Sequence, residues 1–218
     1  METVNTKFQS ETRSDAVDAI GEFYDQAYNL IGSQVAKDAF DITKEPQALV
    51  EKYGSGQAGK RFLISRRLVE SGVRMVSVTF GSWDHHDNIK GSYERYAPEL
   101  DKAYAALISD LDERGLLSET LVLLSTEFGR TPKINKTSGR DHWPRVFSSV
   151  MAGGGIQGGV KYGASDSLAS EVDTDPVSPA DLAATLYHAI GIDSKKELMT
   201  ADLRPIKIVN GGKVLNLF

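Results

Sequence analysis

A pattern of strand, long helix and strand in the middle of the chain constrains the fold most. Residues 73–80, Val-Arg-Met-Val-Ser-Val-Thr-Phe, form a short β-branched run that is typical of a buried strand. A helical repeat of apolar residues covers 93–114, where Pro98 predicts a kink or a fresh start, and 120–125 is a second apolar run. Because a crossover helix usually joins parallel strands, we predict a βαβ unit with ligands beyond the carboxyl ends of its strands.

A helical layer over residues 1–71 precedes this unit. Apolar side chains recur there at spacings of three and four, which is typical of amphipathic helices. The layer contains no cluster of catalytic residue types, so we interpret it as packing. Capping residues, Pro and Gly predict four helices, which begin near Ser14 or Asp15, Ser33, Pro46 and Gln57.

The remaining residues, 72–218, are predicted to complete a single domain with an α/β part. Residues 147–152 are typical of a third strand, and a glycine-rich run follows them. That run lacks the spacing of a phosphate-binding loop, so we interpret it as a turn. Ser178-Pro179 predicts the start of a helix over 180–190, and 206–218 is typical of a terminal β-hairpin.

The composition of the chain excludes several kinds of site and partner. The 218 residues include no cysteine, which excludes disulfides, thiolate metal ligands and a cysteine nucleophile. A formal net charge of -5 gives no overall attraction to polyanions, so neither nucleic acid nor an anionic membrane is expected as the main partner. No run approaches the ~20 apolar residues of a membrane span. The first residues lack the basic and apolar regions of a signal peptide, and the location of the protein stays open.

Three of the four histidines lie in the two polar loops that follow the strands of the predicted βαβ unit. Residues two apart in an extended segment share a face, so Asp84 and His86 can converge on one point while His85 points away. The second loop ends at His142. One carboxylate and two imidazoles are sufficient for a catalytic metal site that keeps an open position for water or substrate. We therefore predict that Asp84, His86 and His142 bind a divalent metal, with Zn²⁺ preferred over Mn²⁺, Mg²⁺ or Ca²⁺.

The second loop also supplies charged residues that could take part in catalysis. Glu127 follows a predicted strand directly, and we expect it to be a fourth ligand or to belong to a second metal. Arg130 and Arg140 can clamp an oxyanion with two parallel hydrogen bonds, which a lysine cannot do in the same geometry. The expected ligand is thus a small anionic molecule.

Each of these residues also has a purely structural interpretation. Asp84 and the adjacent histidines can cap turns, because Asp side chains readily accept hydrogen bonds from nearby backbone groups. Glu127 can form an ion pair with Arg130 or Arg140. His188 lies in an amphipathic helical pattern, and we interpret it as a packing residue. Beside the histidines, Trp83 and Trp143 are either core residues or walls that keep the site dry.

Together, the two loops resemble the motifs of a known bacterial family. The matching segments are Trp83-Asp84-x-His86-x-Asn88, Thr126-Glu127-Phe128-Gly129-Arg130-Thr131-Pro132 and Gly139-Arg140-Asp141-His142-Trp143. They are similar to a family of unassigned function that is abundant in planctomycetes and marine bacteria. Its members are often labelled sulfatases and belong to the alkaline phosphatase superfamily. The resemblance covers about residues 57–191.

This resemblance implies a three-layer α/β/α sandwich with a two-metal site at the carboxyl end of its sheet. It also implies metal-assisted hydrolysis of a phosphate or sulfate ester. By position, Asp84 and His86 match ligands of the first metal, and His142 matches the late histidine that completes that site. Glu127 and Phe128 take the place of an Asp-His pair on the second metal, but Phe128 cannot coordinate a metal.

The nucleophile of the superfamily has no match in this sequence. That fold begins with a strand that ends in a metal-binding Asp, followed by a helix whose first turn carries the nucleophile. Residues 1–71 match neither element, and Ser82 and Thr126 are weak substitutes near the proposed metal. We therefore expect a sandwich that is incomplete at its N-terminal side, in a family whose members are often exported.

Two functions follow from these expectations. The first is a metal-dependent hydrolase of small phosphate or sulfate esters. The alternative is a catalytically inactive binding or structural module that keeps the fold. Sheet surface exposed by an incomplete sandwich would also favour a homo-oligomer.

Overall fold

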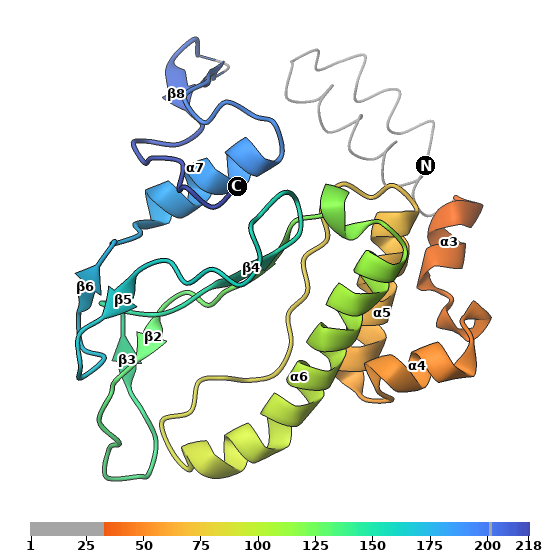
Figure 1. Cartoon of the computed structure of the whole chain (residues 1–218), viewed down its shortest axis with the longest axis horizontal. Helices are drawn as coiled ribbons and strands as arrows, with labels where there is room; N and C mark the ends of the chain where they lie inside the picture. Colours follow the sequence, from red (N-terminus) through yellow and green to blue (C-terminus); the bar gives the residue numbers. More distant parts are fainter. Residues whose placement is uncertain (1–32, 201) are drawn as a thin grey trace, which may run out of the picture.

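The computed structural model describes residues 33–200 and 202–218 (Figure 1). The helix expected near Ser14 or Asp15 lies outside these residues. The described part is a mixed α/β structure with five α-helices and small antiparallel sheets. None of the helices within it is long and apolar enough to cross a bilayer.

The helices predicted after residue 33 are present, and their ends follow from capping. The Ser33 hydroxyl accepts a hydrogen bond from the Ala36 N–H at the start of the first described helix. Gly54 ends the second helix with a φ of 96°, a conformation that favours glycine. Pro98 lies inside the last helix without interrupting it, so of the two predicted alternatives the fresh start is wrong. The four helices are α3 (Gln34–Phe40), α4 (Gln47–Tyr53), α5 (Gln57–Glu70) and α6 (Ile89–Glu113).

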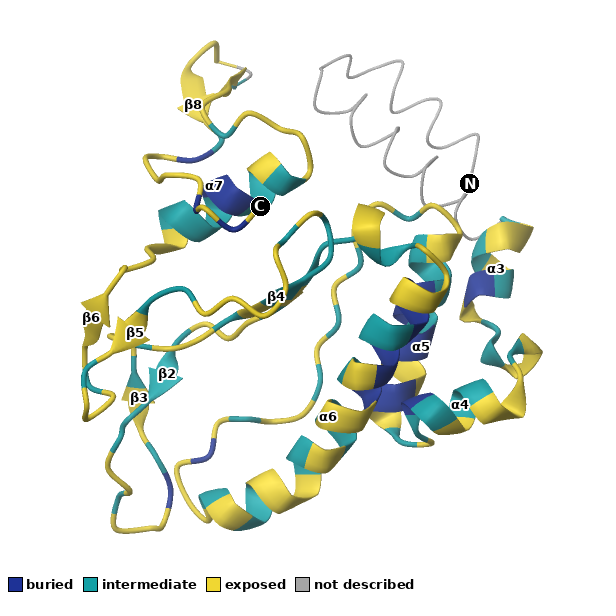
Figure 2. Cartoon of the chain, in the orientation of Figure 1, coloured by how far each residue is buried: buried dark blue, intermediate teal, exposed yellow. Residues whose placement is uncertain are grey.

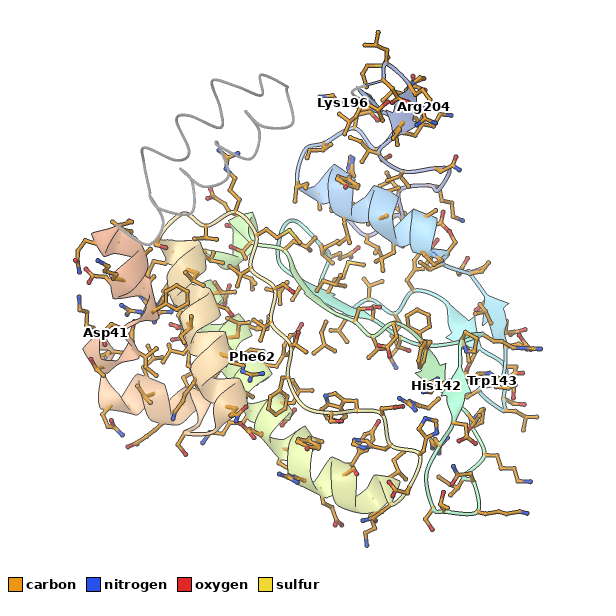
Figure 3. The ribbon with its side chains drawn as sticks, turned by 180° about the vertical axis from the view of Figure 1, so that it is seen from behind. Asp41, Phe62, His142, Trp143, Lys196 and Arg204 are labelled. Atoms are coloured by element: carbon orange, nitrogen blue, oxygen red, sulfur yellow. The ribbon has the colours of Figure 1, made fainter. Side chains whose placement is uncertain are left out.

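The main apolar core joins α4, α5 and α6. Phe62 and Leu63 from α5 pack against Leu107 and Leu111 from α6, and all four side chains are buried. Figure 2 shows this concentration of buried positions on α5 and α6, and Figure 3 places Phe62 in the helical layer, away from His142. The interpretation of residues 33–71 as a packing layer agrees with this arrangement.

A buried ion-pair cluster lies beside the core. The Arg66 guanidinium is 1% exposed and pairs with Glu45 at 2.6 Å and with Asp110 at 2.9 Å. The Tyr53 hydroxyl donates a hydrogen bond to Asp110 at 2.9 Å. Burial alone would raise the pKa of Asp110, but hydrogen bonds from Arg114 and Tyr53 outweigh burial and lower that pKa.

Four two-stranded antiparallel sheets and one further helix make up the rest of the described chain. Short 3-10 helices, Ile42–Lys44 and Leu117–Glu119, lie before α4 and before the first strand. The coarse α/β class is thus confirmed, while the three-layer sandwich stays a prediction. The pairs are β1 (Val122–Leu124) with β4 (Val150–Ala152), β2 (Gly129–Arg130) with β3 (His142–Trp143), β5 (Ala164–Ser165) with β6 (Val172–Thr174), and β7 (Glu197–Met199) with β8 (Pro205–Lys207).

The predicted parallel βαβ unit is not formed within the described residues. Residues 73–80 run extended without joining a sheet, and β1 instead pairs antiparallel with β4. In the second half of this extended segment Val76, Val78 and Phe80 are half-buried, and Val78 and Phe80 pack on the helical core, whereas Met75 is exposed. The apolar side chains of Val78 and Phe80 are therefore covered by helices rather than by a neighbouring strand.

The C-terminal region confirms a helix and corrects a hairpin. Helix α7 (Pro179–Ala189) begins at Ser178, which forms a reciprocal capping box with Asp181. The predicted pairing of 206–209 with 214–218 is wrong, because β8 pairs with β7. The last residues lie along α7 instead (Figure 1), where the Leu215 N–H donates to the Thr185 hydroxyl at 3.0 Å.

Candidate metal centre

Three ligand atoms from the two polar loops meet at one point. Asp84 and His86 lie in the loop before α6, and His142 begins β3. The Asp84 Oδ1 atom is 2.8 Å from His142 Nε2 and 3.1 Å from His86 Nε2. The two Nε2 atoms are 3.1 Å apart. The structure thus confirms that loops distant in sequence bring this Asp-His-His set together.

The spacing of these atoms fits a metal ion. A point about 2.1 Å from all three atoms, the usual metal–ligand distance, lies about 1.2 Å out of their plane. The three side chains are between 46 and 60% exposed, so solvent can reach the centre. The arrangement therefore offers three protein ligands and an open side.

Asp141 fixes the orientation of His86. Its Oδ1 atom lies 2.9 Å from His86 Nδ1, and the Asn135 side-chain amide donates to the same oxygen at 3.2 Å. Hydrogen bonds from His86 and then from Asn135 lower the pKa of Asp141, so this carboxylate is ionised and can only accept. His86 therefore carries its proton on Nδ1 and directs the Nε2 lone pair at the centre.

A centre without a cation would bring unshared electron pairs together. Hydrogen bonds from His142 and Arg130 lower the pKa of Asp84 to about 2, so Asp84 is a carboxylate near neutral pH. His142 Nε2 faces both the Asp84 oxygen and the His86 lone pair, and one proton on that nitrogen cannot satisfy both. A bound cation would satisfy all three atoms.

Polar contacts hold the two loops in register. The His86 carbonyl accepts hydrogen bonds from the Asn135 amide at 2.9 Å and the Thr137 hydroxyl at 2.7 Å. The Arg140 N–H donates to the His85 carbonyl at 3.0 Å. A Cβ atom at Gly139 would lie 2.1 Å from the His86 carbonyl carbon, so the close approach of the loops requires glycine there.

The predicted arginines occupy different positions. Arg130 donates to Asp84 Oδ1 at 2.7 Å, beside the ligand cluster. Arg140 donates from Nη1 to the carbonyls of Thr131 and Pro132, both at 2.6 Å, and so also braces the second loop. Glu127 is exposed, and the structure places it outside the Asp-His-His group, with no ion pair to either arginine within the described chain. Its role as a metal ligand stays a prediction.

The remaining candidates are mostly structural. His85 points away from the centre, as expected, and is buried with its ring stacked on Tyr96. Trp143 donates from its indole to the Ser170 carbonyl at 2.7 Å, and His188 packs against Phe218. Phe128 lies with its ring 4.4 Å from that of His142 and forms a wall of the site.

Reasoning from sequence did not assign a role to Asp141. It was visible as the neighbour of His142, and a carboxylate beside a ligand residue is a signal for a partner that orients an imidazole. The pairing with His86, however, depends on how the two loops approach each other. Residue types and spacing alone could not reveal it.

These features define an α/β protein with a preformed Asp-His-His centre that faces solvent. The chain belongs to the family described as "Protein of unknown function (DUF1501)", whose model matches residues 1–217. No curated protein and no solved structure matches it. The chemistry must therefore be argued from the site itself.

Proposed function

We propose that this protein is a metal-dependent hydrolase of phosphate or sulfate esters. The observation that carries the proposal is the convergence of the Asp84, His86 and His142 ligand atoms within 3.1 Å of one another. Asp141 directs the His86 imidazole at the same point, because its Oδ1 atom lies 2.9 Å from His86 Nδ1. Zn²⁺ is the preferred ion for such a nitrogen and oxygen donor set, and Mn²⁺, Mg²⁺ and Ca²⁺ are the alternatives.

The bound ion and the charged residues of the second loop have different roles in this proposal. A divalent ion in this centre would supply Lewis acidity toward an ester oxygen. Arg130, which already contacts Asp84, would bind a non-bridging oxygen of the anionic group. Arg140 would hold the second loop in place or bind the same anionic group together with Arg130. Glu127, which is exposed, would be a ligand of a second metal or a fourth ligand of the first one.

Membership of the alkaline phosphatase superfamily is part of the same proposal. The motifs around His86, Glu127 and His142 resemble those of the sulfatase-labelled relatives in the alkaline phosphatase superfamily. The α/β class supports that assignment, and the three-layer sandwich with two metals follows from it. Phosphate and sulfate esters are both proposed as substrates, because both present the tetrahedral oxyanion that an arginine recognises.

Metal uptake is the direct test of this proposal. Protein purified without chelator, and the same protein after loading with Zn²⁺ or Mn²⁺, would be measured by inductively coupled plasma mass spectrometry. We expect at least one ion per chain, lost in the Asp84→Ala and His142→Ala variants. His188→Gln changes an imidazole outside the centre and should keep the ion. A wild-type chain that takes up neither metal would overturn the proposal.

A catalytically inactive binding module is the second candidate. It is favoured by one of the two candidate nucleophiles, because the Thr126 hydroxyl donates its hydrogen bond to the Phe128 carbonyl at 2.9 Å. Turnover of p-nitrophenyl phosphate and p-nitrophenyl sulfate separates the two functions. A hydrolase should lose its rate with Asp84→Ala and with chelator. Equal background rates in the metal-loaded wild type and in the Asp84→Ala variant would favour the binding module.

A further inference from the structure

An open surface cavity of about 450 Å³ lies beside the candidate metal centre. Arg130 connects the two, because it lines the cavity and its guanidinium donates to Asp84 Oδ1 at 2.7 Å. The cavity is formed where the start of α6 faces the second polar loop. Its lining residues are Ile89, Lys90 and Tyr93 from α6, Arg130 from β2, and Ile134 and Arg140 from the loop.

One half of this lining is cationic. Lys90, Arg130 and Arg140 contribute positive charge, although Arg130 is already paired with Asp84 at 2.7 Å, and no acidic residue of the described chain lines the cavity. Lys90 has only a surface contact with Glu94, at 3.7 Å and with both side chains largely exposed, which neutralises it weakly. The positive end of the α6 dipole adds to the same field, since Ile89 and Lys90 belong to its first turn. The cavity therefore favours an anion.

The other half of the lining is apolar. Tyr93 is 50% and Ile134 is 43% exposed, so both retain apolar surface that a ligand could cover. Edge-on contacts with Trp83 and His85 hold the Tyr93 ring in position. A free phosphate or sulfate ion would leave this half uncovered. Burial of an attached organic group would add favourable hydrophobic free energy.

We propose that this cavity binds anions that carry an apolar group of aryl size. Lys90 and Arg130 would contact the anionic end, and Ile89, Tyr93 and Ile134 would contact the apolar end. With the metal centre alongside, the ligand is the ester substrate, an aryl or similarly apolar phosphate or sulfate. The identification as substrate rests on the proposed function, whereas the selectivity of the cavity can be measured without a metal.

The test compares three stable probes by isothermal titration calorimetry on the full chain, with chelator and after Zn²⁺ loading. The probes are 1-naphthylphosphonate, methylphosphonate and the neutral 1-naphthylmethanol. We expect naphthylphosphonate to bind at least about tenfold more tightly than either of the others, because it alone satisfies both halves of the cavity. Equal affinity for the two phosphonates would overturn the inference.

Matched variants locate the binding. Ile134→Ser should weaken naphthylphosphonate severalfold and leave methylphosphonate unchanged, whereas Lys90→Gln should weaken both. Ile206→Ser and Lys207→Gln are controls at exposed positions of β8, and they should change neither affinity. Equal effects of Ile134→Ser and Ile206→Ser would contradict the assignment of the apolar half.

The outcomes separate this inference from the proposed function. Selective binding in a chain that takes up no metal would support the ligand class and overturn its role as a hydrolysed substrate. Metal uptake without selectivity between the phosphonates would still support the metal centre, but it would overturn the proposal that the cavity binds anions with an apolar group. Selective binding that strengthens on Zn²⁺ loading would support both.

Discussion

The helical layer and the region that carries the metal centre are stabilised in different ways. Helices α4 to α6 share one contiguous cluster of buried apolar residues, and a buried Arg66–Asp110 pair lies beside it. After residue 116, the buried apolar residues of the described chain are Ala184, Val209, Leu215 and Leu217, and none of them lies in the site loops. Figure 2 shows mostly exposed or half-buried positions there.

This contrast assigns separate tasks to the two regions. The site loops are joined by side-chain hydrogen bonds to backbone carbonyls, such as those from Asn135 and Thr137 to His86. Such contacts fix geometry but contribute little net stability each, roughly 0.5–1.5 kcal/mol. Mutations in the helical layer should therefore change the free energy of unfolding, and mutations in the loops should change metal affinity.

The largest effect is expected from breaking the buried ion-pair cluster. Asp110→Ala would leave Arg66 with fewer partners and the Tyr53 hydroxyl without its acceptor. Removing one partner of a buried pair typically costs about 3–5 kcal/mol. Urea unfolding followed by circular dichroism measures this change, and Asp202→Ala, at an exposed position, is the control. A loss below 1 kcal/mol, as for a surface pair, would contradict the role of this cluster.

The same cluster predicts a dependence of stability on pH. The pKa values of Glu45 and Asp110 are lowered in the folded protein, because hydrogen bonds from Arg66 and Arg67, and from Arg114 and Tyr53, outweigh burial. Stability from these groups is thus present above the ordinary carboxyl pKa of about 4 and is lost as the pH falls through the lowered values. The difference in unfolding free energy between wild type and Asp110→Ala should shrink between pH 7 and pH 3. A constant difference would argue against this linkage.

The next effect compares equivalent truncations in the two regions. Leu63 is 1% exposed in the helical core, and Leu63→Ala should cost about 2–5 kcal/mol through lost burial and a cavity. Leu198 in β7 is 54% exposed, and Leu198→Ala should change the free energy of unfolding by about 0.5 kcal/mol or less. Chemical denaturation of both variants provides the measurement. Similar losses would mean that the β region has packing comparable to that of the helices.

The accuracy of prediction from sequence differs between the same two regions. Helix starts at Ser33 and Ser178 and the helix stop at Gly54 depend on local capping, so the sequence revealed them. Strand partners depend on tertiary context. Residues 76–80 alternate between apolar and polar side chains, a pattern that equally suits a strand or an extended segment packed on helices. The pattern could not distinguish these two environments.

The site likewise contains residues whose role could be predicted from the sequence and residues whose role depends on the fold. Asp84, His86 and His142 could be predicted because the chemistry of metal ligands limits the residue types, and their loops follow apolar segments. The part played by Arg140, which donates to the Thr131 and Pro132 carbonyls, required the fold of the loop. So did the pairing of Asp141 with His86.

A smaller effect, on affinity rather than stability, is expected at Asp141. Asp141→Asn removes the charge that holds the His86 proton on Nδ1, and loss of such a partner typically lowers metal affinity by about 10–100-fold. Competition with a chromogenic chelator measures the affinity for Zn²⁺. The absorption spectrum of the Co²⁺-loaded variant reports altered ligand geometry, which a change confined to folding stability would not produce. Asp173→Asn, at an exposed position on β6, is the control, and equal affinities of the two variants would contradict the role of Asp141.

The smallest effect on the first metal is expected at Glu127. This exposed residue lies outside the Asp-His-His group, so Glu127→Gln should leave the affinity of the tightest Zn²⁺ site within about twofold of wild type. If Glu127 belongs to a second metal, the variant should lose one ion per chain in titrations, while Glu197→Gln on β7 keeps both. A marked loss of affinity at the tightest site would instead make Glu127 a fourth ligand. It would also mean that the loop after β1 moves toward the centre when metal binds, as a region held by few apolar contacts can do.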